Sequence, residues 1–384
     1  MKILVVSDKF KGSMTSRQAG EVIARGIRMA ARQKAVPVEI EVVPVADGGE
    51  GMLEVVETQL PVRRFQVESL DPLERPMMAD LLMTVDGSCA YIEMAATNGL
   101  WLLDREERNP RRTTTWGLGE LVKFAVRDLQ VPRIVIGLGG SATNDGGVGL
   151  LSSLGYCFDA KGFLADDVAA YLASVRRIDD QGVGQVVPNL DHVRIDVATD
   201  VDNPLTGPQG ATCVFGRQKG AGAEDLAALE EGMKNWAAQA AAFLGKDHAS
   251  LAGAGAAGGT GFALMAFLGG RQCRGWELVA ELAHLEEKIK AADWVITGEG
   301  SFDRQSLQGK LPYGIASLCE RYDKPLSLFC GRNTVSREVY RSLGIQEVFS
   351  LRDLERRSDI CIRYAEHLLE YRAFLEATRR FQDR

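Results

Sequence analysis

The sequence predicts an α/β fold in which a parallel-sheet domain carries a second α/β domain, with a mixed sheet, as an insertion. Short apolar runs that end at Gly or Asp alternate with segments of helical periodicity near both ends of the chain. The middle of the chain instead has consecutive strand-like runs joined by a hairpin turn. At 384 residues the chain is long enough for two domains.

The N-terminal region follows a strand–helix–strand–helix order. Residues 3–6 predict a buried strand, and Thr15 with Gln18 matches a capping box at the start of a helix. Residues 39–45 predict a second strand and residues 52–58 a second helix. Apolar residues on one face of the first helix are Ala19, Val22, Ile23, Ile27 and Ala30. A parallel sheet with right-handed crossovers is therefore expected.

The remaining elements follow from the same patterns. Strands are predicted at residues 65–67, 77–85, 89–94, 133–136, 193–197, 294–297, 325–329 and 346–350. Helices are predicted at residues 113–129, 224–243, 262–268 and 360–381. We expect a discontinuous Rossmann-like domain from residues 1–60 and 285–384, and an inserted domain from residues 61–284.

Composition excludes several classes of protein. The formal net charge of −7 argues against a nucleic-acid partner, because phosphate binding needs a basic face. Seven scattered cysteines without a Cys-x-x-Cys pair indicate buried apolar residues in a reducing compartment, and four histidines show no metal-ligand spacing. Residues 249–270 lack charge, but their many glycines favour a loop over a membrane helix. We expect a cytoplasmic protein with no membrane partner.

Five predicted strands end in segments rich in Gly with Asp, Glu, Asn or Lys. They are residues 7–13, 46–51, 137–147, 199–203 and 298–303. In open α/β sheets ligands bind at the carboxyl ends of strands, where glycine lets backbone N–H groups approach an anion. Carboxylates and lysines beside such loops indicate phosphate held together with Mg²⁺.

A search for known nucleotide-binding and catalytic motifs reduces the number of possible functions. The P-loop pattern is missing, because Leu311 follows Lys310, and the protein-kinase set is absent. The pattern Gly137-x-Gly139-x-x-Ala142 follows a predicted strand and keeps open a nucleotide-dependent oxidoreductase of a small hydroxy acid. Among the basic residues, Lys11 and Lys219 are flanked by glycine, which favours a shared anion.

Nine ordered segments of the chain resemble the signature segments of the class I (bacterial) glycerate kinases. They are residues 8–13, 45–51, 92–96, 109–115, 137–147, 200–205, 215–220, 253–261 and 297–310. Lys9 and Arg217 depart from the family pattern, yet no glycine or carboxylate is lost. The resemblance implies transfer of phosphate from ATP, with Mg²⁺, to D-glycerate in a cleft between two domains. It implies 2-phosphoglycerate as the product, while the residues leave the 3-isomer open.

On this resemblance we assign expected roles to individual residues. Catalytic residues are Asp47, Asp200, Lys11 and Lys219, and Mg²⁺ ligands are Asp200, Glu299 and Asp303. Nucleotide contacts are Gly139, Gly140, Ser141, Gly255, Gly258 and Gly259. Substrate contacts are Asp8, Lys11, Glu50, Asn144, Asp145 and Asn203. A non-catalytic glycerate sensor and the oxidoreductase remain alternatives, and a homodimer is left open.

Overall fold

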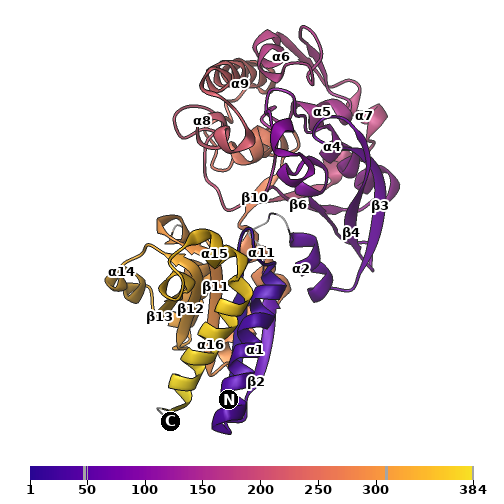
Figure 1. Ribbon diagram of the computed structural model, residues 1–384. Helices are drawn as coiled ribbons and strands as arrows, with labels where there is room; N and C mark the ends of the chain where they lie inside the picture. Colours follow the sequence, from indigo (N-terminus) through magenta and orange to yellow (C-terminus); the bar gives the residue numbers. More distant parts are fainter. Residues whose placement is uncertain (46–48, 50, 308–309, 383–384) are drawn as a thin grey trace. The chain divides into compact units, whose positions relative to one another are not determined.

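Residues from both ends of the chain form one unit of the structure. The computed structural model describes residues 1–45, 49, 51–307 and 310–382. Unit 1 consists of Met1–Asp47 and Trp276–Arg384, and unit 2 of Gly48–Gly275 (Figure 1). The domain boundaries expected after residues 60 and 284 stay a prediction.

Unit 1 is built on a parallel five-stranded sheet in the order β13-β12-β11-β1-β2. Its strands are β1 (Lys2–Ser7), β2 (Glu39–Pro44), β11 (Trp294–Phe302), β12 (Leu326–Asn333) and β13 (Ile345–Ser350). Its helices are α1 (Ser16–Lys34), α12 (Leu285–Ala291), α13 (Leu311–Arg321), α14 (Arg337–Ser342), α15 (Ser358–Arg363) and α16 (Ala365–Gln382), and α11 (Gly275–Leu282) begins at the junction.

The first helix shows how the sequence determines the local structure of unit 1. The Thr15 side chain accepts from the Gln18 N–H and the Gln18 side chain accepts from the Thr15 N–H, so the predicted capping box is confirmed. The expected apolar face of α1 is buried. It packs beside α16, as Figure 1 shows. Gly26 permits this packing, because a Cβ there would lie 2.3 Å from the Glu370 carbonyl oxygen.

Unit 2 contains a mixed six-stranded sheet in the order β10-β9-β6-β5-β4-β3 and a small β7–β8 pair. The strands are β3 (Val62–Leu70), β4 (Pro76–Thr84), β5 (Ala90–Glu93), β6 (Arg133–Gly137), β7 (Cys157–Asp159), β8 (Arg177–Asp179), β9 (Arg194–Ala198) and β10 (Arg271–Cys273). Pairs β3–β4 and β4–β5 are antiparallel, and β5, β6, β9 and β10 run parallel.

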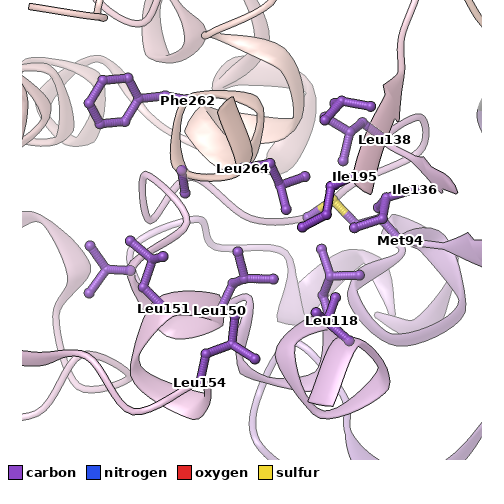
Figure 2. Close-up of a cluster of buried hydrophobic side chains, with 14 of the residues drawn as sticks. Met94, Leu118, Ile136, Leu138, Leu150, Leu151, Leu154, Ile195, Phe262 and Leu264 are labelled. Atoms are coloured by element: carbon purple, nitrogen blue, oxygen red, sulfur yellow. The ribbon is translucent and has the colours of Figure 1, made fainter. Parts of the chain in front are cut away.

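The helices of unit 2 are α2 (Met52–Gln59), α3 (Ala95–Asn98), α4 (Trp116–Lys123), α5 (Val148–Ser153), α6 (Val168–Ser174), α7 (Val183–Val186), α8 (Ala211–Phe215), α9 (Ala223–Leu244) and α10 (Thr260–Phe267). Some of these helices, among them α4 and α10, pack on the six-stranded sheet, whereas α6 and α9 pack on each other. Figure 2 shows side chains of the sheet, such as Ile136 and Ile195, meeting Leu118 of α4, Leu150 of α5 and Leu264 of α10 in one buried cluster. The predicted mixed α/β fold is confirmed.

Three expectations about local structure are wrong. Residues 298–303 are not all loop, because β11 continues to Phe302, and Gly331 lets β12 pass close to Gly300. The terminal helix is two helices, α15 and α16, that break at Tyr364. The helix expected at residues 113–129 begins at Trp116 and ends in a π-turn, Phe124–Asp128.

Two cysteines differ from the expectation that all seven are buried. Cys157 and Cys213 are exposed, because β7 lies outside the main sheet and Cys213 is on the outer side of the short helix α8. The uncharged stretch contains α10, which has eight residues. Within the described ranges, no helix has both the length and the apolar character needed to cross a bilayer.

Candidate active site

Loops that follow β6 and β9 meet at one edge of the unit 2 sheet. The two strands are parallel neighbours, with Gly137 opposite Ala198. Their carboxyl ends therefore lie together, and so do residues 138–147 and 199–210 that follow them. Segment 253–261 packs onto the first of these loops, because the Gly146 N–H donates to the Gly258 carbonyl over 3.0 Å.

Lys219 lies inside this group of loops. It ends a 3₁₀ turn, Arg217–Lys219, and only 2% of its surface is exposed. Its Nζ donates to Ser141 Oγ (3.0 Å) and to the Thr143 carbonyl (2.6 Å). Burial lowers the pKa of Lys219 to about 7, against the opposing attraction of Asp145. An anion beside this amine would favour its charged form.

The glycine after Lys219 explains its place in the sequence motif. Gly220 has φ +103°, a conformation that favours glycine. A Cβ at this position would lie 1.9 Å from the Arg108 carbonyl oxygen. The chain can therefore turn sharply after Lys219 and leave its side chain directed at the β6 loop.

Asp145 organises the loop. It is fully buried, and its Oδ2 accepts from the Thr115 N–H (2.8 Å), Thr115 Oγ1 (2.7 Å) and the Gly149 N–H (3.1 Å). Its Oδ1 accepts from the Gly147 N–H. Burial raises the pKa of Asp145, while these four donors act in the opposite direction. Protein donors thus surround this carboxylate, and its expected contact with the substrate stays a prediction.

Two buried polar atoms near Lys219 lack a hydrogen-bond partner among the described residues. Asn144 is fully buried; its Nδ2 donates to Thr212 Oγ1 (3.0 Å), whereas its Oδ1 has no hydrogen-bond partner among the described residues. The buried hydroxyl of Thr143 is also without a partner in that part of the chain. Unpaired buried polar atoms are costly and need an explanation. A bound polar ligand supplies one.

The glycines expected to contact nucleotide are required for close packing of the loops. Gly258 has φ +69°, and a Cβ there would lie 2.0 Å from the Thr143 carbonyl oxygen. Gly259 has φ +94° and lies against Gly146. The N–H of Gly255 already donates to the Asn203 carbonyl over 2.8 Å. These glycines bring the two loops together, and their contacts with a nucleotide stay a prediction.

The start of the β6 loop is packed in the same way. A Cβ on Gly139 would lie 2.4 Å from Gly49 Cα. Gly140 has φ +81°, and its carbonyl accepts from the Leu100 N–H over 2.9 Å. Ser141, the next residue, provides the hydroxyl that Lys219 contacts.

The β9 loop holds two further predicted residues. Asp200 Oδ1 accepts from the Gly275 N–H (2.9 Å), and Asn203 Nδ2 donates to the Gln209 carbonyl (2.8 Å). Both interactions lie within unit 2. Asp47 and Glu50, by contrast, lie outside the described residues.

The other predicted residues belong to unit 1, at the ends of β1 and β11. The Asp8 N–H donates to the Gly298 carbonyl (2.8 Å), and the backbone of Lys11 lies beside Gly300. The pKa of Glu299 is raised to about 8 by burial first and then by the nearby charges of Asp8 and Asp303, against a hydrogen bond from Ser306 and the charge of Lys310.

This carboxylate cluster of unit 1 suits a cation in part. Glu299 Oε1 is buried and has no hydrogen-bond partner among the described residues. Mg²⁺ prefers carboxylate oxygens and usually takes one or two of them together with phosphates and water. Within the described ranges, no group of three or more His, Cys, Asp or Glu side chains would hold a metal ion on its own. Glu299 and Asp303 thus fit Mg²⁺ that arrives with a phosphate. Asp200 lies in unit 2, and its expected role as a Mg²⁺ ligand stays a prediction.

Sequence reasoning missed two residues that shape the unit 2 site. Thr115 holds Asp145 through both its N–H and its hydroxyl, and a run of three threonines before a helix was the available signal. Glu93 ends the buried strand β5 and is 8% exposed. Glu93 could have been recognised in the sequence as an acidic residue at the end of an apolar strand.

The oxidoreductase pattern does not have its expected structural context. In a dinucleotide site the glycine loop leads directly into a helix. Here β6 ends at Gly137 and α5 begins only at Val148. The intervening loop instead surrounds Lys219.

Known proteins resemble this chain over nearly its whole length. The family model of the glycerate kinase family matches residues 3–378. The glycerate kinase of Bacillus subtilis (strain 168) is 40% identical over 356 residues, covering 91% of this chain and 90% of that protein. The glycerate 2-kinase of Escherichia coli (strain K12) is 39% identical over 355 residues, with 91% and 90% covered.

A solved structure is similar as well. The crystal structure assigned to glycerate kinase 2 from Salmonella typhimurium LT2 superposes with a TM-score of 0.78 at 36% identity. The alignment covers 100% of this chain and 99% of that chain.

Proposed function

Because the chain belongs to the glycerate kinase family, we propose that it transfers the γ-phosphoryl group of ATP to the 2-hydroxyl of D-glycerate. The products are 2-phosphoglycerate and ADP. Phosphorylation of glycerate is the reaction class of the family; the donor, the Mg²⁺ and the position of the new phosphate are our proposal. The site in a cleft between two domains, expected from the sequence, stays a prediction.

The buried amine of Lys219 is the observation that carries this proposal. Phosphoryl transfer depends on positioning and on neutralising charge more than on covalent help from the protein. An anionic phosphoryl group beside Lys219 raises the pKa of the amine from about 7, so the bound state has a charged ammonium at the transferring group. Ser141 and Thr143 fix the direction of Nζ.

In this proposal the unpaired atoms near Lys219 bind polar groups of the two substrates. The Thr143 hydroxyl can donate to a phosphate oxygen, and Asn144 Oδ1 can accept from a hydroxyl of glycerate. Binding would then remove the cost of burying these atoms without partners. In this proposal the glycine loops 139–141 and 255–259 receive the phosphates of the nucleotide.

The carboxylates have separate proposed tasks. Asp47 and Asp200 are our candidates for accepting the proton of the glycerate hydroxyl, a role that needs a carboxylate within hydrogen-bond reach. Glu299 and Asp303 of unit 1 would hold Mg²⁺, which neutralises phosphate charge when bound. Lys11 stays a predicted cationic contact for the glycerate carboxylate.

A coupled assay tests the reaction and its position. The protein is mixed with D-glycerate, ATP and Mg²⁺, and the product is passed to enolase with or without phosphoglycerate mutase. We expect ADP that depends on glycerate, and an enolase signal without the mutase. A signal only with mutase would show the 3-isomer, and glycerate-dependent stabilisation without ADP would show a binding protein.

A further inference from the structure

Glu93 links three parts of unit 2: strand β5, the start of helix α2 and the loop after β6. It is the last residue of β5 and is 8% exposed. Its Oε1 accepts from the Gly51 N–H (3.1 Å) and its Oε2 from the Leu53 N–H (3.3 Å). Helix α2 begins at Met52, and Gly51 has no side chain to cap it. Glu93 therefore supplies, from another strand, the acceptors and negative charge that a helix start requires.

The backbone of the same region is tied to the loop after β6. Glu93 lies opposite Gly137 in the parallel pair β5–β6, and the Met94 N–H donates to the Gly137 carbonyl over 2.9 Å. The loop that contacts Lys219 starts directly after Gly137. Glu93 thus stands between the start of α2 and the start of this loop.

A second contact closes the connection. The Met52 N–H donates to the Gly49 carbonyl over 3.1 Å, so Gly49 is attached to the first turn of α2. Gly49 in turn packs on Gly139, where a Cβ would approach its Cα to 2.4 Å. Any movement of the first turn of α2 would therefore change the surface on which Gly139 rests.

We infer that Glu93 is a positioning residue: by holding the first turn of α2 it keeps Gly49 packed on Gly139 and fixes the loop 139–141. This inference rests on the proposed function, in which that loop receives the phosphates of ATP. Glu93 does not itself touch the reacting atoms. Its effect is on binding of the nucleotide, through the shape of the loop.

The chemistry of the carboxylate predicts the outcome of substitution. Among the described residues, the N–H groups of Gly51 and Leu53 face the two carboxylate oxygens of Glu93, and an amide offers only one oxygen. In Glu93→Gln, one of the donors meets an NH₂ group and loses its partner. Glu93→Leu removes both acceptors, so its effect should be larger than that of Glu93→Gln.

The matched control is Asp71→Asn. Asp71 is also buried, and its Oδ1 accepts from the N–H groups of Leu73 and Arg75 in the turn between β3 and β4. Its Oδ2 accepts from Arg75 Nε, so the hydrogen bonds of Asp71 to described residues stay within its own turn, and none of them reaches the β6 loop.

The experiment compares the full-length wild type, Glu93→Gln, Glu93→Leu and Asp71→Asn. For each protein, the melting temperature, kcat, and KM for ATP and for glycerate are measured. We expect Glu93→Gln to raise KM for ATP at least about tenfold, while KM for glycerate stays within twofold of wild type. Glu93→Leu should raise KM for ATP more than Glu93→Gln does. Asp71→Asn should lower the melting temperature and leave both KM values within twofold.

The inference is overturned if folded Glu93→Gln has a wild-type KM for ATP. It is also overturned if both KM values rise together, or if Asp71→Asn changes KM for ATP as much. Failure of the proposed function is seen separately, because the wild type would then release no glycerate-dependent ADP.

Discussion

At the scale of single residues, Lys219 and Asp145 are two buried ionisable groups of unit 2 that interact through their charges. Glycines on both sides of Lys219 were enough to single it out from the sequence, since they indicate a chain that bends around an anion. The same reasoning failed to show what Asp145 does. Its main partner, Thr115, is thirty residues away in the sequence, and only the folded chain brings them together.

Removal of the Lys219 amine should stop catalysis without unfolding the protein. Lys219→Met keeps the length and apolar character of the side chain and removes the charge. We expect kcat to fall about 10²–10³-fold, the usual cost of losing one group that stabilises transition-state charge. The coupled assay measures the rate, and circular dichroism checks the fold. A rate within threefold of wild type would exclude Lys219 from catalysis.

The same substitution should change how stability depends on pH. The pKa of Lys219 is about 7 in the folded protein, against an ordinary value of 10.5. Between these values the unfolded chain binds more protons, so the free energy of unfolding rises with pH, by at most about 1.4 kcal/mol per unit. Below pH 7 the amine is charged in both states and adds no slope.

Urea unfolding at pH 7.5, 8.5 and 9.5 measures this effect. The difference in stability between wild type and Lys219→Met should move in favour of wild type as the pH rises. Parallel pH profiles would show that Lys219 has an ordinary pKa in the folded protein.

At the scale of elements, the sequence predicted local features such as helix starts correctly, but it did not predict which elements pack against each other. Thr15 and Gln18 predicted the start of α1 correctly because a capping box lies within four residues. Glycines at the end of β11 predicted a loop, yet Gly300 and Gly331 serve the close pairing of β11 with β12. A glycine required by a turn and one required by a neighbouring backbone look alike in the sequence.

The α1–α16 contact should depend on Gly26. In Gly26→Ala the new Cβ meets backbone of α16, which cannot move aside easily. We expect a loss of about 1–2 kcal/mol, because overpacking exceeds the gain in helix propensity. Chemical denaturation measures it. Gly184→Ala in α7 is the control, since its Cβ meets open space and should be neutral or stabilising; equal effects would contradict the packing argument.

The carboxylates at the ends of β1 and β11 should bind Mg²⁺ through Glu299. With ATP present to supply the phosphate, and at a Mg²⁺ concentration ten times Kd, the wild type should gain about 1.4 kcal/mol of stability relative to EDTA. Glu299→Gln should lose this gain, because the oxygen without a partner is replaced and the negative charge is removed. Thermal unfolding with ATP in both samples, and with either MgCl₂ or EDTA, is the measurement.

A variant of another acidic residue in unit 1 provides the control for the Mg²⁺ test. Glu347→Gln on β13 should keep the Mg²⁺ effect. If Glu299→Gln responds to Mg²⁺ as the wild type does, the ion binds elsewhere.

At the scale of the whole molecule, the described residues include one large buried hydrophobic cluster in unit 2 and another in unit 1. The alternation of strands and helices predicted the parallel sheet, and the hairpin signal predicted the mixed sheet. Both patterns can be recognised because they involve residues that are close together in the sequence. The small β7–β8 pair was missed because each strand has three residues, too few for a periodicity.

Separate cores should open separately. Ile296→Ala removes a buried side chain of β11 and should cost about 2–5 kcal/mol in unit 1. Hydrogen exchange should then accelerate in β1, β11 and β12 and stay slow in β6 and β9. Ile136→Ala should give the reverse. Equal acceleration in both sheets would show that the two cores open as one.

The position of β1 in the centre of its sheet has a consequence for synthesis of the protein. β1 pairs with β2 on one side and with β11 on the other. On the ribosome, β1 and β2 emerge first, but β11 is completed only at Phe302. At about 5–20 residues per second, one edge of the nascent strand stays open for roughly 15–60 s. Unit 1 therefore cannot complete its sheet until the whole of unit 2 has been synthesised.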